Sequence, residues 1–256
     1  MLNKMNNEVD YLSEILELIN KVEENNKAIK TLKDEDTRKI FFRMLISSLQ
    51  MYYLGLNSIF IAKTIGLVNP NLSEVEKTHV KNFTELSKEL KLDSGNIGIS
   101  AKTPDKNFIT IYNDILRMNL INDCWVCFES TLREIFYVRE CTKYKNRIWE
   151  IYTNEVFNSK DINITEDNKK FLGFLGNCRN AMHNNSFHDP KNEIDKYNNW
   201  EYTLNGKNFK LEKGKKIEFM NKETILKIIE KLSDVALDMW NNLNYPYFIP
   251  KRYNSI

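Results

Sequence analysis

Apolar residues recur along most of this chain at intervals of three and four, the spacing that places side chains on one face of a helix. The expected helices cover residues 8–33, 37–66, 73–92, 108–141, 144–157 and 221–243, together with one helix that ends near 183. The segment over 108–141 is apolar almost all round, which is typical of a central helix packed against several others. The pattern therefore predicts an all-α fold, a multi-helix bundle.

The stretch over 171–188 carries the side chains best suited to chemistry. Its apolar stripe is made of Phe171, Leu172, Phe174, Leu175 and Cys178. Arg179 and His183 follow four residues apart, so a helix holds them on one face, one turn from each other. Thr165 is placed to cap this helix, with Asn168 at the position where a capping box has glutamate. Arg binds phosphate oxygens through a planar fork of donors, and the proton of His moves near neutral pH, so the pair is suited to act on a phosphodiester.

Residues 200–219 interrupt the helical pattern. Apolar and polar side chains alternate there, and Asn205-Gly206 is a strong signal for a type I′ hairpin turn. The expected short strands cover residues 200–204, 208–211 and 216–219. We therefore expect a small β-hairpin or meander, inserted after the helix that carries Arg179.

The segment Arg179-Asn180-Ala181-Met182-His183 resembles the Arg-Asn…His signature of the HEPN superfamily (higher eukaryotes and prokaryotes nucleotide-binding). The usual motif has Arg, a polar residue, three further residues and His. Here His183 comes one residue earlier, and His188 lies beyond the expected helix end. The shorter form is similar to one in bacterial relatives, some of which also carry an insert after the motif. The resemblance implies an all-helical HEPN-like bundle.

The same resemblance implies a metal-independent endoribonuclease that acts as a toxin or a phage-defence effector. The ribose 2′-OH would attack the adjacent phosphorus and leave a 2′,3′-cyclic phosphate and a 5′-OH. His183 suits the proton transfer and Arg179 the stabilisation of the developing charge. Asn180 is placed to hold a phosphate oxygen, and Asn184 to orient the imidazole. Lys207 and Lys210 on the basic hairpin are the candidates for binding the RNA substrate, and the alternative is that such lysines only solvate the strand edges.

One imidazole does not easily serve as both the base and the acid of the same transfer. A symmetric dimer that joins two motifs supplies two Arg179 and two His183 side chains, as the resemblance implies. The expected partners are therefore RNA, a second copy of the chain with a composite site, and an antitoxin or defence-system protein.

The length of 256 residues fits a single HEPN-like domain over 1–256. A finer division has an N-terminal helical subdomain over 1–92 and a core over 107–256, because the loop between them is rich in Gly, Ser and Asp. The formal net charge of +2 gives no general attraction to nucleic acid, so an RNA site requires a local basic patch.

Four cysteines without a disulfide-like framework fit a reduced, cytoplasmic protein. Cys124 and Cys127 have a metal-like spacing but no second pair of ligands, so we expect them to be packing residues, with no metal and no cofactor. No secretory signal is visible, and no stretch approaches the roughly 18 apolar residues of a membrane helix.

Two other interpretations remain. In the first, the chain is a non-catalytic HEPN-like module that binds RNA or protein. In the second, it is a structural protein whose basic hairpin binds a partner. In either case, Arg179 would bond carbonyls at the helix end and His183 would be favoured there by the helix dipole. Glu129, Arg133 and Glu134 either orient the motif or form ordinary ion pairs.

Overall fold

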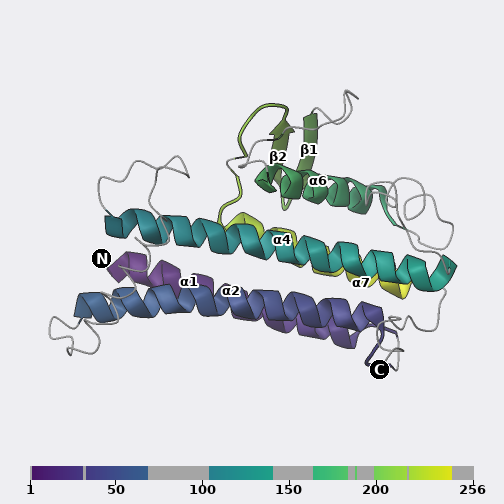
Figure 1. Cartoon of the computed structure of the whole chain (residues 1–256), viewed down its shortest axis with the longest axis horizontal. Coiled ribbons are helices and arrows are strands. Elements are labelled where there is room, and N and C mark those ends of the chain that lie inside the picture. Colours follow the sequence, from purple (N-terminus) through teal and green to yellow (C-terminus); the bar gives the residue numbers. More distant parts are fainter. Residues whose placement is uncertain are drawn as a thin grey trace. The chain divides into compact units, whose positions relative to one another are not determined.

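The computed structural model describes residues 2–30, 33–68, 104–140, 164–183, 188, 199–217 and 219–243. In these ranges the chain is mostly helical and has one small antiparallel sheet (Figure 1). The elements are α1 (Leu2–Lys27), α2 (Thr37–Val68), α4 (Pro104–Glu140), α6 (Glu166–His183), β1 (Asn199–Leu204), β2 (Lys207–Glu212) and α7 (Lys222–Asn241). The prediction of a helical protein with a small β-insert after the motif helix is confirmed for this part of the chain.

The helix boundaries follow the apolar pattern in most places. α2, α4 and α7 each begin and end close to their predicted limits, whereas α1 ends at Lys27 and not at 33. The N–H of Ile29 bonds the carbonyl of Asn26 at 3.4 Å, a three-residue spacing typical of a helix end. The predicted helices over 73–92 and 144–157 lie outside the described residues.

The β-insert is a hairpin. β1 pairs with β2 in a register that places Tyr202 opposite Phe209. Asn205 and Gly206 have φ angles of 49° and 76°, as the predicted type I′ turn requires. One face of the hairpin is buried, through Tyr202, Leu204, Phe209 and Leu211.

The prediction of a third strand over 216–219 is wrong, because the sheet of the described residues has two strands. The backbone just before that segment is bonded elsewhere. The N–H of Gly214 donates to the carbonyl of His188 at 2.7 Å, and the N–H of His188 donates to the carbonyl of Lys215 at 3.0 Å. These bonds hold the chain after β2 against His188 and leave the hairpin with two strands.

The chain divides into two compact units, Met1–Ser13 with Met51–Met118 and Glu14–Gln50 with Asn119–Ile256. In the first unit, the hydroxyls of Tyr11 and Tyr52 share a buried hydrogen bond of 3.1 Å. Gly55 lies so close to Leu116 that a Cβ would be 2.9 Å from the leucine Cδ1. A glycine at this position therefore lets α2 and α4 approach closely.

The second unit has an aromatic cluster at its core, made of Phe41, Phe42, Phe128 and Trp240, all at most 1% exposed. The rings of Phe41 and Trp240 meet edge to face with centroids 4.4 Å apart, while Phe128 stacks on Trp240 at 6.3 Å. Trp240 belongs to the buried face of α7, which also contains Ile225, Ile228, Ile229, Leu232, Val235, Ala236 and Met239. This face was predicted from the spacing of its apolar residues.

A buried ion pair stands at the start of α2. Asp36 Oδ2 lies 2.8 Å from Arg38 Nη2, and both side chains are at most 2% exposed. Asp36 Oδ1 also accepts the backbone N–H of Arg38 at 2.9 Å. The Nη1 of Arg38 donates to the carbonyl of Trp240 at 3.2 Å, so the pair joins the start of α2 to the end of α7.

Candidate functional site

The helix α6 begins at a side-chain cap. The N–H of Asn168 donates to Thr165 Oγ1 at 3.2 Å, and the N–H of Lys169 donates to the Thr165 carbonyl at 3.0 Å. The predicted cap at Thr165 is therefore confirmed. The side chain of Asn168 links α6 to α7, because its Nδ2 donates to Asp238 Oδ2 at 3.4 Å.

One face of α6 is fully packed. Its buried residues are Phe171, Leu172, Phe174, Leu175, Cys178, Ala181 and Met182. Two glycines on the same helix accommodate tryptophans: a Cβ at Gly173 would overlap the indole of Trp200, and one at Gly176 would lie 3.1 Å from Cη2 of Trp125. The apolar stripe was predicted, and it fixes α6 along its whole length.

Arg179 and Asn180 follow this stripe near the C-terminal end of α6. Arg179 is half-buried, and its Nη1 donates to Asn180 Oδ1 at 3.2 Å. Its Nε is buried and has no acceptor among the described residues. No described carboxylate or backbone carbonyl is bonded to this guanidinium.

His183 is the last residue of α6, so its backbone lies one helical turn beyond Arg179, on the same face. The side chain of His183 and the whole of Asn184 lie outside the described residues. His188 is buried, 2% exposed, and is fixed by its backbone to the turn after β2. The helix thus places the backbones of Arg179, Asn180 and His183 together, as predicted.

Lys207 and Lys210 lie on β2 and have different surroundings. Lys210 stands directly opposite Glu201, with its Nζ 3.5 Å from the carboxylate. Lys207 belongs to the other face, opposite Leu204, and its Nζ lies 5.5 Å from the centre of the Phe209 ring. No described contact joins either lysine to Arg179.

The hairpin instead packs on the first half of α6. Trp200 Nε1 donates to the carbonyl of Lys170 at 3.3 Å, and the ring of Tyr202 stacks on Phe174 with centroids 5.6 Å apart. The hydroxyl of Tyr202 donates to Asp167 Oδ2 at 3.2 Å. Burial, with Asp167 beside the hydroxyl, raises the pKa of Tyr202. Arg179 lies five residues beyond Phe174, about 7.5 Å further along the helix axis.

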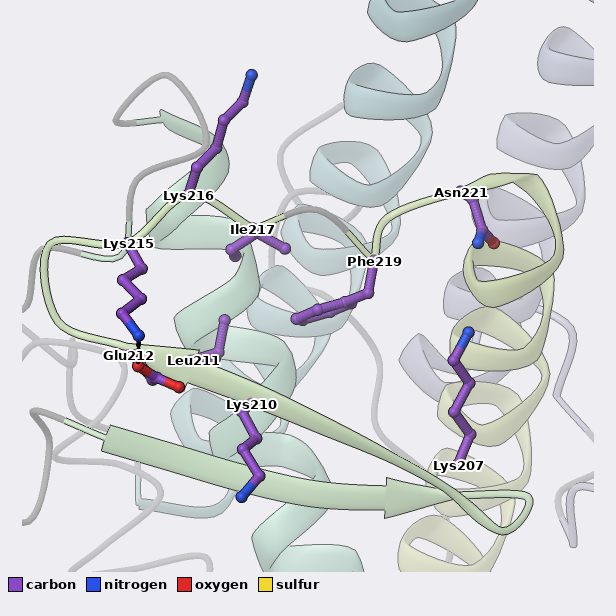
Figure 2. Close-up of a pocket in the computed structure, with 9 residues that line it drawn as sticks. All are labelled: Lys207, Lys210, Leu211, Glu212, Lys215, Lys216, Ile217, Phe219 and Asn221. Carbon is purple, nitrogen blue, oxygen red and sulfur yellow. Dashed lines mark ion pairs between the residues drawn. The ribbon is translucent and has the colours of Figure 1, made fainter.

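A basic hollow of about 370 Å³ opens beside the hairpin (Figure 2). Its lining residues are Lys207, Lys210, Leu211, Glu212, Lys215, Lys216, Ile217, Phe219 and Asn221. The basic character of this segment was visible in the sequence. The inclusion of Phe219 was not, because it depends on contacts with Phe174 and Phe209, whose ring centroids lie 5.8 Å and 5.0 Å away.

The other candidate residues from the sequence form ordinary ion pairs or are packed in the core. Arg133 forms an ion pair with Glu129 at 2.8 Å, one turn away on its own helix. Cys124, Cys127 and Cys178 are free and buried, as expected of packing cysteines. Burial raises the pKa of Cys127 to about 11 and that of Cys178 well above its ordinary range, so neither is an activated nucleophile.

Among the residues that the structure describes, no three His, Cys, Asp or Glu side chains gather as metal ligands would. In the same ranges, no helix is long and apolar enough to cross a membrane. Comparison with protein-family models, curated proteins and solved structures finds no match to this chain.

Proposed function

We propose that this protein is a metal-independent endoribonuclease of the HEPN type, a cytoplasmic toxin or phage-defence effector whose site lies at the C-terminal end of α6. The observation that carries the proposal is the state of Arg179. Its Nε is a buried donor without an acceptor in the described chain, and its Nη1 bonds only the neighbouring amide of Asn180. No described carboxylate neutralises the guanidinium, so its charge remains for a phosphate.

In the proposed reaction, the ribose 2′-oxygen attacks the adjacent phosphorus and loses its proton to a base. The bond between phosphorus and the 5′-oxygen breaks, and that oxygen gains a proton. The products are a 2′,3′-cyclic phosphate and a 5′-OH. His183 transfers a proton, while the guanidinium of Arg179 stabilises the charge on the phosphoryl oxygens. Asn180 holds the guanidinium through its Oδ1, which leaves its amide N–H groups for a phosphate oxygen.

The reaction needs a base at one oxygen and an acid at the other. One His183 per chain supplies one of these roles at a time, so the proposal includes a homodimer in which two α6 helices share a site at the two-fold axis. An antitoxin or another defence protein is the proposed partner that restrains this activity.

The test is cleavage of a defined single-stranded RNA by the purified chain in EDTA. We expect cleavage with cyclic-phosphate ends, and losses of about 10²–10⁴-fold for His183→Ala and about 10²–10³-fold for Arg179→Ala. Lys170→Ala is the matched control, because this exposed cation lies on the same helix far from Arg179. Equal cleavage by wild type and His183→Ala, or loss of cleavage in EDTA, would contradict the proposal.

A second candidate function is a non-catalytic module that binds RNA. It is favoured by the basic hollow of the hairpin, which no described contact connects with Arg179. RNA binding without cleavage, unaffected by His183→Ala, would support this function over the first.

A further inference from the structure

We infer that the basic hollow beside the hairpin is a second contact for single-stranded RNA, which holds phosphates on its lysines and a base against Phe219. The inference rests on the proposed function for the choice of RNA as the ligand. The hollow is then a substrate-binding site that is separate from the cleavage site on α6.

The charge of the hollow favours an anion. Four lysines line it against one glutamate. Lys215 forms an ion pair with Glu212, and Lys210 with Glu201 on the outer face of the hairpin. Lys207 and Lys216 have no carboxylate partner among the described residues. These two are therefore the lysines most available to phosphate.

The positions of these two lysines favour an extended ligand. Figure 2 shows Lys207 and Lys216 on opposite sides of the hollow, with the Nζ of Lys216 directed away from Phe219. A chain of phosphates can pass from one lysine to the other. The side-chain oxygen of Asn221 accepts the N–H of Thr224 at 2.9 Å, which fixes this side chain in the wall of the hollow.

The floor of the hollow is apolar and aromatic. Leu211 and Ile217 are 1% and 7% exposed, and the half-buried ring of Phe219 is directed toward them (Figure 2). Phe174 stacks on Phe219 with an interplanar angle of 22° and holds its ring in place. Lysines that only protect a strand edge need no such floor, whereas lysines around an aromatic ring are typical of single-strand binding sites.

The hollow and Arg179 contact different parts of a substrate. Phe219 rests on Phe174, which lies five residues before Arg179 on α6. Five residues correspond to about 7.5 Å of rise and about 140° of rotation around a helix. Binding in the hollow and cleavage at Arg179 are therefore separable by mutation.

The experiment is fluorescence anisotropy of the full chain with a labelled 2′-O-methyl RNA, which has no free 2′-OH and is not cleaved. We expect Lys207→Ala with Lys216→Ala to weaken binding about tenfold and to lower the salt dependence by about 1.4 in log–log slope. Lys213→Ala is the matched control, because Lys213 is exposed in the turn between β2 and Lys216 but does not line the hollow. An oligonucleotide without bases should bind at least about fivefold more weakly.

The inference is overturned if the wild type does not bind the oligonucleotide, or if Lys213→Ala weakens binding as much as the double variant. Equal binding of a duplex, or equal competition by polyglutamate, would also overturn it, in favour of a general polyanion or an acidic protein. Because the ligand is not cleavable, binding that depends on the lysines stands even if the ribonuclease test fails. All the substituted lysines are exposed, so their variants are expected to remain folded.

Discussion

At the scale of single residues, Asp36 and Arg38 form an ion pair that is almost fully buried. The pair also binds the backbone N–H of Arg38 in the first turn of α2 and the carbonyl of Trp240 near the end of α7. Removing one member of a buried pair leaves the other charge uncompensated in a medium of low polarity, which is costly.

Asp36→Ala should therefore lower the free energy of unfolding by about 3–5 kcal/mol. Asp34→Ala is the control: its side chain is 81% exposed and pairs with Lys39 at 3.2 Å, so the loss should stay below about 1 kcal/mol. Urea titrations followed by circular dichroism measure both values. Similar midpoints for the two variants would show that the buried pair contributes little.

The buried thiol of Cys127 should make the stability of the fold depend on pH. Burial raises its pKa from 9.0 to about 11. Below pH 9 the thiol is protonated in both the folded and the unfolded chain. Between pH 9 and 11 only the unfolded chain loses the proton, so stability falls over this range, by at most about 3 kcal/mol from this group.

Cys127→Ala should flatten the fall in stability between pH 9 and 11, as measured by urea titration at several pH values. In the folded wild type, alkylation of Cys127 by iodoacetamide at pH 9 should be much slower than in urea, because the reactive thiolate is scarce. Fast labelling of the folded chain, located by mass spectrometry, would contradict the burial of this thiol.

At the scale of elements, the contact between α6 and the hairpin depends on a glycine facing a tryptophan. Gly173→Ala places a methyl group against the indole of Trp200. Overpacking of this kind costs about 1–3 kcal/mol, and the better helix propensity of alanine returns about 1 kcal/mol. We expect a net loss of up to about 2 kcal/mol.

Trp200→Leu in the same chain should remove that loss, so the two substitutions should be strongly coupled in a double-mutant cycle. Gly176→Ala is the milder comparison, because its new Cβ would lie 3.1 Å from Trp125 Cη2 and small shifts can relieve the contact. The measurement is again the urea midpoint. Additive effects at 173 and 200 would show that the ring does not press on the helix.

The sequence predicted those features whose cause is local. The apolar stripe that begins at Phe171 predicted α6, and the cap at Thr165 predicted where this helix starts. Asn205-Gly206 predicted the hairpin turn. The third strand was predicted wrongly because the chain near Gly214 bonds to His188, a distant residue. The buried state of Asp36 and the place of Phe219 likewise depend on partners far along the chain, and periodicity carries no information about such partners.

At the scale of the whole molecule, the proposed dimer can be tested by mixing active and inactive chains. Wild type mixed with an equal amount of His183→Ala should form mixed dimers that carry a single His183. If the reaction needs one imidazole from each chain, these mixed dimers are inactive, and cleavage per wild-type chain should fall to about half, since random pairing places half of the wild-type chains in mixed dimers. Sedimentation of each variant provides the control for dimer formation.

Cleavage per wild-type chain that stays constant in the mixture, while the chains form dimers, would place a complete working site in one chain. A monomer that cleaves RNA would remove the need for a dimer altogether. Either outcome would leave the proposed role of Arg179 unchanged and would revise only the number of chains that contribute to one site.

The contact between Gly173 and Trp200 also constrains the order in which this protein can change over generations. Enlarging residue 173 first meets the indole, whereas reducing residue 200 first opens a space that a larger residue 173 can then fill. Lineages that leave the glycine–tryptophan combination should therefore pass through a smaller residue at 200. Sequences that descend from a common ancestor with this chain would record that order as a linked change at two positions 27 residues apart.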